Sequence, residues 1–208
     1  LTFTASETIS TPVVTFNSGG TAITDTSVTY VNTSGNTWTA AYTANASDTS
    51  GSVTFSIAFT DTAGNAGTAV TSGSGSVTFD STAPTLSSVS IASDNSTNTQ
   101  AIADDVVTLT FTASETIGTP VVTFKSGGDA ITDTSITYAN SGNVHTAKYT
   151  VDTDDTAGSV TYSIAFTDTA GNAGTAVTSG TGSVTFDATA PTMAITASEV
   201  SDGGTSND

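Results

Sequence analysis

Alternation of large apolar residues with small ones is the clearest pattern in this chain. Val160, Tyr162, Ile164 and Phe166 occupy every second position, with Thr, Ser and Ala between them. A period of two places one set of side chains on each face of a β-strand, so the stretch predicts a strand with an apolar inner face. Three further rows alternate in the same way, at residues 53–59, 109–113 and 147–151. No stretch has the apolar spacing of an amphipathic helix, and the pattern predicts an all-β protein.

The sequence also repeats itself at long range. The eighteen residues SIAFTDTAGNAGTAVTSG at 56–73 return unchanged at 163–180. VTFDSTAPT at 77–85 returns as VTFDATAPT at 184–192, a spacing of 107 residues. A unit of this length is a whole β-sandwich domain and is too long for a solenoid repeat.

Gly, Asn, Asp and Ser turns divide each unit into short strands. In the complete unit the expected strands lie near 85–92, 105–113, 119–125, 131–139, 144–151, 159–167 and 174–186. About seven antiparallel strands in roughly one hundred residues predict tandem immunoglobulin-like β-sandwich domains.

The phase of the repeat divides the chain unevenly. LTFTASETI at residue 1 matches residue 109, within the second expected strand of the later unit. We therefore expect residues 1–79 to form a domain without its first strand, 80–187 a complete domain, and 188–208 the opening strand region of a further repeat. Two explanations stay open: a window from a longer array, or a donor strand that completes the first domain of the next protomer.

Composition and charge exclude several classes of binding partner. The chain has 48 Thr and 29 Ser among 208 residues, and β-branched Thr favours strands. The net charge of −17, with only Lys125 and Lys148 as basic residues, removes the electrostatic basis for binding nucleic acid. With no cysteine, disulfides and thiolate zinc sites are excluded. No apolar run has the length of a membrane span and no signal peptide is evident, so we expect no membrane insertion within this segment.

Acidic residues gather in the loops at the expected domain junctions, where oxygen ligands without His or Cys suit calcium. The candidate ligands are Asp80, Glu115, Asp168 and Asn172, their first-domain counterparts Glu7, Asp61 and Asn65, and Asp187, Asp154 and Asp155. Turn chemistry explains the DTAGN loops equally well, because Asp can cap backbone N–H groups there. The VDTDDTAG loop is interpreted as a solvated loop or a second ion site.

No catalytic constellation is recognisable, so we expect a protein that is not an enzyme and holds no organic cofactor. His145 is the single histidine, and Trp38 takes its place in the other copy. We expect both residues at a strand edge. A serine hydrolase needs a base held by a third group, and a glycosidase pair would here be duplicated in adjoining small domains.

A strand ending in D-x-A-G-N, a further strand and then V-T-F-D-x-T-A-P resembles the bacterial immunoglobulin-like repeats of giant surface adhesins. Both copies carry this pattern, so the resemblance covers essentially the whole chain. It implies tandem sandwiches that act as spacers, often stiffened by calcium at their junctions.

The leading hypothesis is a non-catalytic spacer of an extracellular, cell-surface adhesin or filament. Its partners would be neighbouring identical repeats, in the same chain or in head-to-tail protomers. The alternatives are a filament subunit assembled by strand donation from residues 188–208, and a carbohydrate-binding module.

Overall fold

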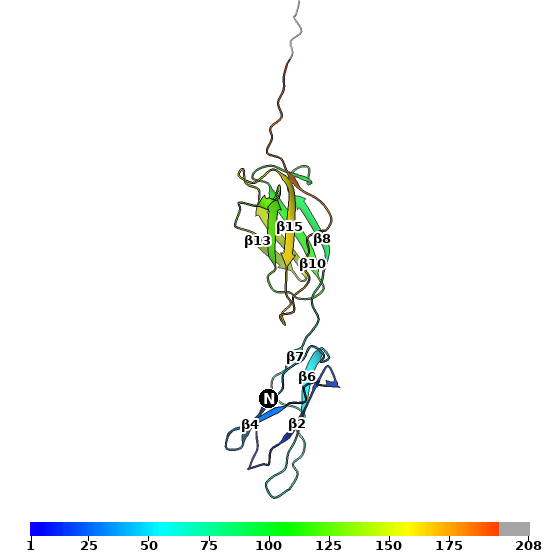
Figure 1. Cartoon of the computed structure of the whole chain (residues 1–208), viewed down its shortest axis with the longest axis vertical. Helices are drawn as coiled ribbons and strands as arrows, with labels where there is room; N and C mark the ends of the chain where they lie inside the picture. Colours follow the sequence, from blue (N-terminus) through cyan, green and yellow to red (C-terminus); the bar gives the residue numbers. More distant parts are fainter. Residues whose placement is uncertain (196–208) are drawn as a thin grey trace, which may run out of the picture.

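The computed structural model describes residues 1–195, and every regular element in that part is a β-strand. No sheet of the described chain combines strands from residues 2–79 with strands from residues 86–186. Figure 1 shows two bodies lying end to end, joined by a single extended linker. The prediction of an all-β, immunoglobulin-like sandwich fold is confirmed.

Two facing sheets form the second sandwich. The first sheet has the order β13-β14-β10-β8, comprising β8 (Leu86–Ser93), β10 (Val106–Ala113), β13 (Thr137–Ser141) and β14 (Val144–Thr150). The second has the order β12-β11-β15-β16-β9, comprising β9 (Gln100–Ala101), β11 (Val121–Ser126), β12 (Asp129–Ala130), β15 (Gly158–Ala165) and β16 (Thr185–Phe186). All of these strand pairs are antiparallel except β16 with β9.

The core of the second sandwich consists of the alternating rows that the sequence predicted. Leu109 and Phe111 of β10 are fully buried, as is Ile164 of β15. Phe124 and Tyr149 pack between the sheets with ring centroids 4.8 Å apart. The period-two rows therefore point inward from both sheets.

Two of the predicted strands are wrong in extent. Residues 131–136 form no strand, and β13 begins only at Thr137. The reason is that backbone donors here bond to side chains instead of a neighbouring strand, as when Thr132 N donates to the Asp155 carboxylate at 2.7 Å.

The predicted strand 174–186 is also mostly irregular, because it changes sheets. Val177 pairs with Ile164 in one sheet, Thr181 pairs with Ser90 in the other, and only Thr185–Phe186 continues as a strand. The backbone passes close to β8 at Gly180, where a Cβ atom would lie 2.4 Å from the Val89 oxygen.

The first sandwich repeats this arrangement without described counterparts of β8 and β9. Its sheets have the orders β1-β5-β4 and β3-β2-β6-β7. The strands are β1 (Thr2–Thr4), β2 (Val13–Ser18), β3 (Thr21–Ala22), β4 (Thr29–Ser34), β5 (Thr37–Ala41), β6 (Gly51–Ala58) and β7 (Thr78–Phe79). Within the described residues, no strand lies beside β1 in the way that β8 lies beside β10.

The segment after Asp187 is described only in part. Residues 188–195 form no strand, and the remainder of the predicted opening strand lies outside the described residues. Within residues 1–195, no helix has the length and apolar character needed to cross a membrane.

Candidate metal site at the domain junction

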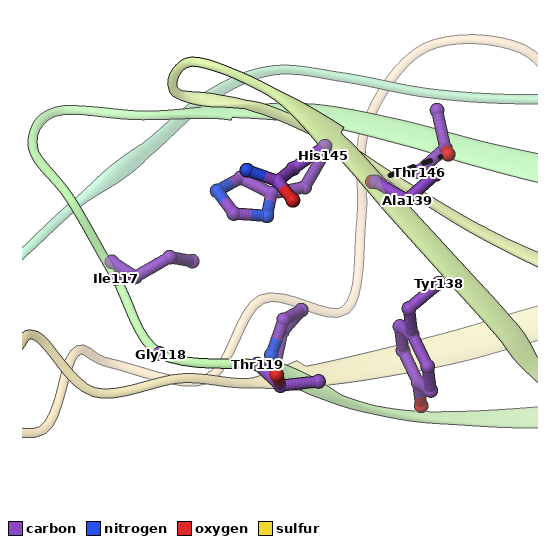
Figure 2. Close-up of a pocket in the computed structure, with 9 residues that line it drawn as sticks. Ile117, Gly118, Thr119, Tyr138, Ala139, His145 and Thr146 are labelled. Atoms are coloured by element: carbon purple, nitrogen blue, oxygen red, sulfur yellow. Dashed lines mark hydrogen bonds between the residues drawn. The ribbon is translucent and has the colours of Figure 1, made fainter.

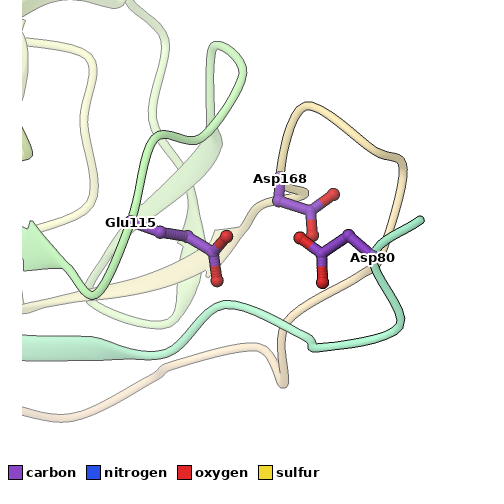
Figure 3. Close-up of side chains that lie close together, drawn as sticks. All are labelled: Asp80, Glu115 and Asp168. Carbon is purple, nitrogen blue, oxygen red and sulfur yellow. The ribbon is translucent and has the colours of Figure 1, made fainter. Parts of the chain in front are cut away.

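Three acids from distant parts of the chain meet at the pole where the linker enters the second sandwich. Asp80 lies in the linker, Glu115 follows β10 and Asp168 follows β15. One carboxylate oxygen from each lies within 4.8 Å of the other two. Figure 3 shows the Asp80 and Asp168 carboxylates facing each other while Glu115 points toward them from the opposite loop.

The DTAGN turn fixes Asp168. Its Oδ1 accepts hydrogen bonds from the backbone N–H groups of Gly171 at 2.7 Å and Asn172 at 2.8 Å, and its Oδ2 accepts one from Asn172 Nδ2 at 2.8 Å. Burial raises the pKa of Asp168, but the hydrogen bonds from Asn172, Gly171 and Ala170 outweigh it and lower the pKa below 3.8. The carboxylate is therefore charged at neutral pH and held in one orientation.

The same turn also holds the linker. Asn172 Nδ2 donates to the backbone oxygen of Asp80 at 3.1 Å. On the other side, the Ser81 N–H donates to Ser50 Oγ of the first sandwich at 3.0 Å. Two consecutive linker residues are thus bonded to different sandwiches.

The geometry of the three carboxylates fits one hard cation. Ca²⁺ binds oxygens at about 2.3–2.6 Å, so two ligands of one ion lie no more than about 4.6–5.2 Å apart. The 4.8 Å limit for Asp80, Glu115 and Asp168 falls within that range. Like charges this close repel, and a divalent ion between them would remove the repulsion.

The first sandwich has the same turn, but no described residue takes the place that Asp80 has beside Asp168. Asp61 accepts hydrogen bonds from Asn65 N at 2.8 Å and from Asn65 Nδ2 at 2.7 Å. Glu7 occupies the position equivalent to Glu115. Within the described residues these two acids do not belong to a group of three, so this turn serves as an internal reference for the Asp168 site.

The remaining predicted ligands stand apart from that group. Asp187 is exposed and accepts a hydrogen bond from Thr189 N at 2.8 Å, as Asp80 does from Thr82 N at 2.9 Å. Asp155 is buried and caps the backbone of Thr132 and Asp152, while Asp154 is exposed. In the VDTDDTAG loop, which the sequence predicted to be a solvated loop or a second ion site, Asp152 and Asp154 are exposed but Asp155 is buried.

His145 does not lie at a strand edge, and that expectation is wrong. Its strand β14 runs between β13 and β10, and its ring stacks on Phe111 with centroids 5.5 Å apart. Only 6% of the residue is exposed, and burial lowers its pKa. The inward row of Ala147, Tyr149 and Val151, continued back by two residues, would have identified it as buried.

A cleft of about 170 Å³ lies beside His145. Figure 2 shows the ring across from the loop of Ile117, Gly118 and Thr119. The other lining residues are Pro120, Tyr138, Ala139, Asn140 and Thr146, so no carboxylate or thiol lines the cleft to orient the imidazole. The cleft lacks the arrangement of nucleophile, base and orienting group that acyl transfer requires.

Comparison with known proteins gives neither a family-model match nor a match to a curated protein. Among solved structures, the I-band fragment I67–I69 of titin aligns at 15% identity and a TM-score of 0.39, covering 84% of this chain and 54% of that one. The titin tandem A164–A165 aligns at 17% identity, 85% and 82% coverage, and a TM-score of 0.26. The tandem immunoglobulin repeats of Dlar align at 13% identity, 85% and 82% coverage, and a TM-score of 0.26. The chain therefore spans about half the length of the I-band fragment.

Proposed function

We propose that this chain is a non-catalytic spacer, a pair of immunoglobulin-like sandwiches that sets distance in an extracellular surface adhesin or filament. The observation that carries the proposal is the linker, which bonds through Asp80 to the second sandwich and through Ser81 to the first. Its partners are neighbouring repeats, so reach grows with the number of units while stability stays local.

Calcium is proposed as the ion that stiffens the junction. Asp80 belongs to the linker, whereas Glu115 and Asp168 belong to the second sandwich, so one ion bound by all three would tie the linker down. Asn172 supports the site by holding both Asp168 and the Asp80 backbone. Water and carbonyl oxygens would supply the rest of the six to eight ligands that calcium takes.

The test is a calcium titration of the full chain after treatment with a chelator. Scanning calorimetry is expected to show that calcium raises the melting temperature of the second sandwich. At a calcium concentration one hundred times the dissociation constant, the free energy of unfolding is expected to increase by about 2.7 kcal/mol. Small-angle scattering is expected to show a narrower distribution of end-to-end distances, because the linker loses freedom.

Asp168→Asn and Asp61→Asn form a matched pair for this test. Each removes the charge of the same turn, but only Asp168 belongs to the group of three acids. We expect Asp168→Asn to abolish the calcium response and Asp61→Asn to leave it intact. If the melting temperature and the solution shape are the same with calcium and with chelator, calcium does not stiffen the junction.

A second candidate function is a filament subunit assembled by strand donation. Its motivation is the match between residues 187–193 and residues 80–86, because in the second sandwich the latter lead directly into β8. The two functions are compatible, because strand donation would join chains end to end into a longer spacer.

A further inference from the structure

The edge strand β13 of the second sandwich carries two polar side chains on the inner face of its sheet. In the register of β13 and β14, Tyr138 lies opposite Ala147, and Asn140 lies opposite His145. Side chains of directly opposite residues point to the same face of a sheet. Ala147 and His145 are buried, whereas Tyr138 and Asn140 are exposed. The inner face of this sheet is therefore open along its edge strand.

The loop that leads into β11 forms the opposite wall of this opening. The cleft of about 170 Å³ lies between the loop at residues 117–120 and the pair β13 and β14. Ile117 and Pro120 of the loop are buried, and the Gly118 N–H donates to Thr167 O at 2.9 Å, which fixes the backbone. Figure 2 shows the His145 ring directed toward the loop, with Tyr138 further along. The walls of the cleft thus come from both sheets.

His145 is a buried polar group whose ring nitrogens have no hydrogen-bond partner within residues 1–195. Only 6% of the residue is exposed, and one face of its ring is covered by Phe111. The pKa of the imidazole is lowered by burial alone, so the ring is neutral at pH 7 and has one donor and one acceptor nitrogen. Because buried polar groups are normally hydrogen-bonded, a ligand in the cleft would find these nitrogens available.

Two neighbours complete the set of groups around the cleft. The Asn140 amide makes one long hydrogen bond, from Nδ2 to Gly142 O at 3.4 Å, which leaves its oxygen free. The Tyr138 hydroxyl accepts a hydrogen bond from Val122 N at 3.1 Å, which anchors a ring that is 39% exposed. An imidazole, an amide and an aromatic surface therefore border one small space.

The chemistry of the lining selects a neutral ligand with hydroxyl groups. No charged side chain lines the cleft, so a charged ligand would have no counterion there. The imidazole and the amide each offer a donor and an acceptor, and a hydroxyl group can bond to either. The volume is below the range of about 300–1,000 Å³ that drug-sized ligands occupy, so the ligand has about the size of a single ring.

We propose that this cleft binds one neutral pyranose unit of a glycan. His145 and Asn140 hydrogen-bond to hydroxyl groups of the sugar, while the aromatic ring of Tyr138 packs against its C–H face. The site would add glycan binding to the proposed spacer function.

The first copy offers a natural comparison. Trp38 stands in the place of His145 and lies opposite Asn32 in the register of β4 and β5. An indole is larger than an imidazole and has a single donor and no acceptor. We therefore expect the sugar to bind to the second sandwich and not to the first.

Nuclear magnetic resonance of the full chain tests the proposal, because His145 is its only histidine and gives unambiguous imidazole signals. The probes are the methyl pyranosides of glucose, galactose, mannose and N-acetylglucosamine, added in the presence of a chelator so that calcium does not contribute. At least one of them is expected to shift the imidazole signals in a saturable way, with a dissociation constant of about 1 mM. Sorbitol, an open-chain polyol, is expected to cause no saturable shift.

Asn140→Ala and Asn32→Ala are a matched pair of variants. Both residues are exposed and lie at the same strand position, so both variants are expected to fold. Asn140→Ala is expected to weaken binding about tenfold, because it removes a hydrogen bond to the sugar, whereas Asn32→Ala is expected to have no effect. His145→Trp is expected to fill the cleft and abolish the shift of the Gly118 backbone signal, and Trp38 shows that the fold accepts an indole at this position.

Three outcomes would overturn the proposal. The first is that none of the pyranosides gives a saturable shift at concentrations up to about one hundred times the expected constant. The second is that sorbitol shifts the imidazole signals as strongly as the sugars do, which would show an adventitious additive only. The third is that Asn140→Ala, with the backbone spectrum of a folded chain, binds the sugar as tightly as the wild type does.

Discussion

At the residue scale, one substitution between the two copies changes how the core responds to protons. His145 is buried against Phe111, while the equivalent Trp38 is half-buried in β5. An imidazole in this position stays neutral because burial disfavours its charged form. The first copy places no titratable group there, so the two sandwiches differ in one internal proton acceptor.

This difference predicts a pH dependence confined to the second sandwich. The unfolded chain protonates His145 as the pH falls through about 6.5, whereas the folded chain does so only at lower pH. The contribution of the neutral imidazole is therefore complete above about pH 6.5 and is lost as the pH falls from there through the folded-state pKa. Urea unfolding between pH 7.5 and 5 is expected to show this slope, and His145→Trp is expected to remove it.

The aspartates of the two DTAGN turns titrate outside that window. The pKa of Asp168 is lowered because its hydrogen bonds outweigh burial, and that of Asp61 because Asn65 donates to it. Their contribution is present above the ordinary value of 3.8 and is lost only as the pH falls through their lower folded values. Equal slopes for the wild type and His145→Trp between pH 7.5 and 5 would contradict the assignment to His145.

At the scale of elements, the last segment of the second sandwich joins both sheets. Residues 174–186 bond first to β15, then to β8 and then again to β15. Gly180 lets this crossing backbone approach β8 closely, because there is no room for a side chain. The unchanged stretch that ends at Gly73 and Gly180 therefore has two different surroundings.

Gly180→Ala is expected to destabilise the second sandwich by about 1–3 kcal/mol, because the added methyl group would overlap the Val89 oxygen and the Tyr162 hydroxyl. Gly73→Ala, set in the same eighteen residues, is expected to change the stability of the first sandwich by less than about 0.5 kcal/mol. Chemical denaturation of both variants measures the difference. Equal losses would show that the effect arises from the local sequence and not from β8.

The sequence predicted those features that depend on local pattern. The row from Val160 to Phe166 is buried as its period of two requires, and Asp168 meets Asp80 because both flank strands at one pole. The sheet change of residues 174–186 was not predictable in this way, since Val177 and Thr181 read as one continuous strand. Neither was the capping of Thr132 by Asp155, which depends on two segments 23 residues apart.

At the scale of the whole molecule, the two sandwiches have unequal cores. The first buries four apolar residues in its core, Val14, Phe16, Ala40 and Ile57. The core of the second contains nineteen such residues, among them Val89 and Ile91 of β8. Because buried apolar area is the main source of stability, each core is expected to stabilise its own sandwich.

The full chain is therefore expected to unfold in two transitions, because each sandwich has its own core and no sheet of the described residues joins the two. Hydrogen exchange is expected to be faster in β1 than in β10, because β10 pairs with β8 and β14 whereas β1 pairs with β5 alone among the described residues. One cooperative transition with equal protection of both copies would contradict this description.

The serine contact at the linker has a consequence for arrays of such units. Ser50 and Ser81 are hydrogen-bonded to each other at the first junction. Their counterparts in the second copy are Ala157 and Ala188, whose side chains cannot form hydrogen bonds. The two segments that follow the sandwiches therefore differ in the hydrogen bonds that can restrain them. In a rod of many such units, the stiffness of each linker would depend on whether Ser or Ala occupies these two positions, and not on the number of units.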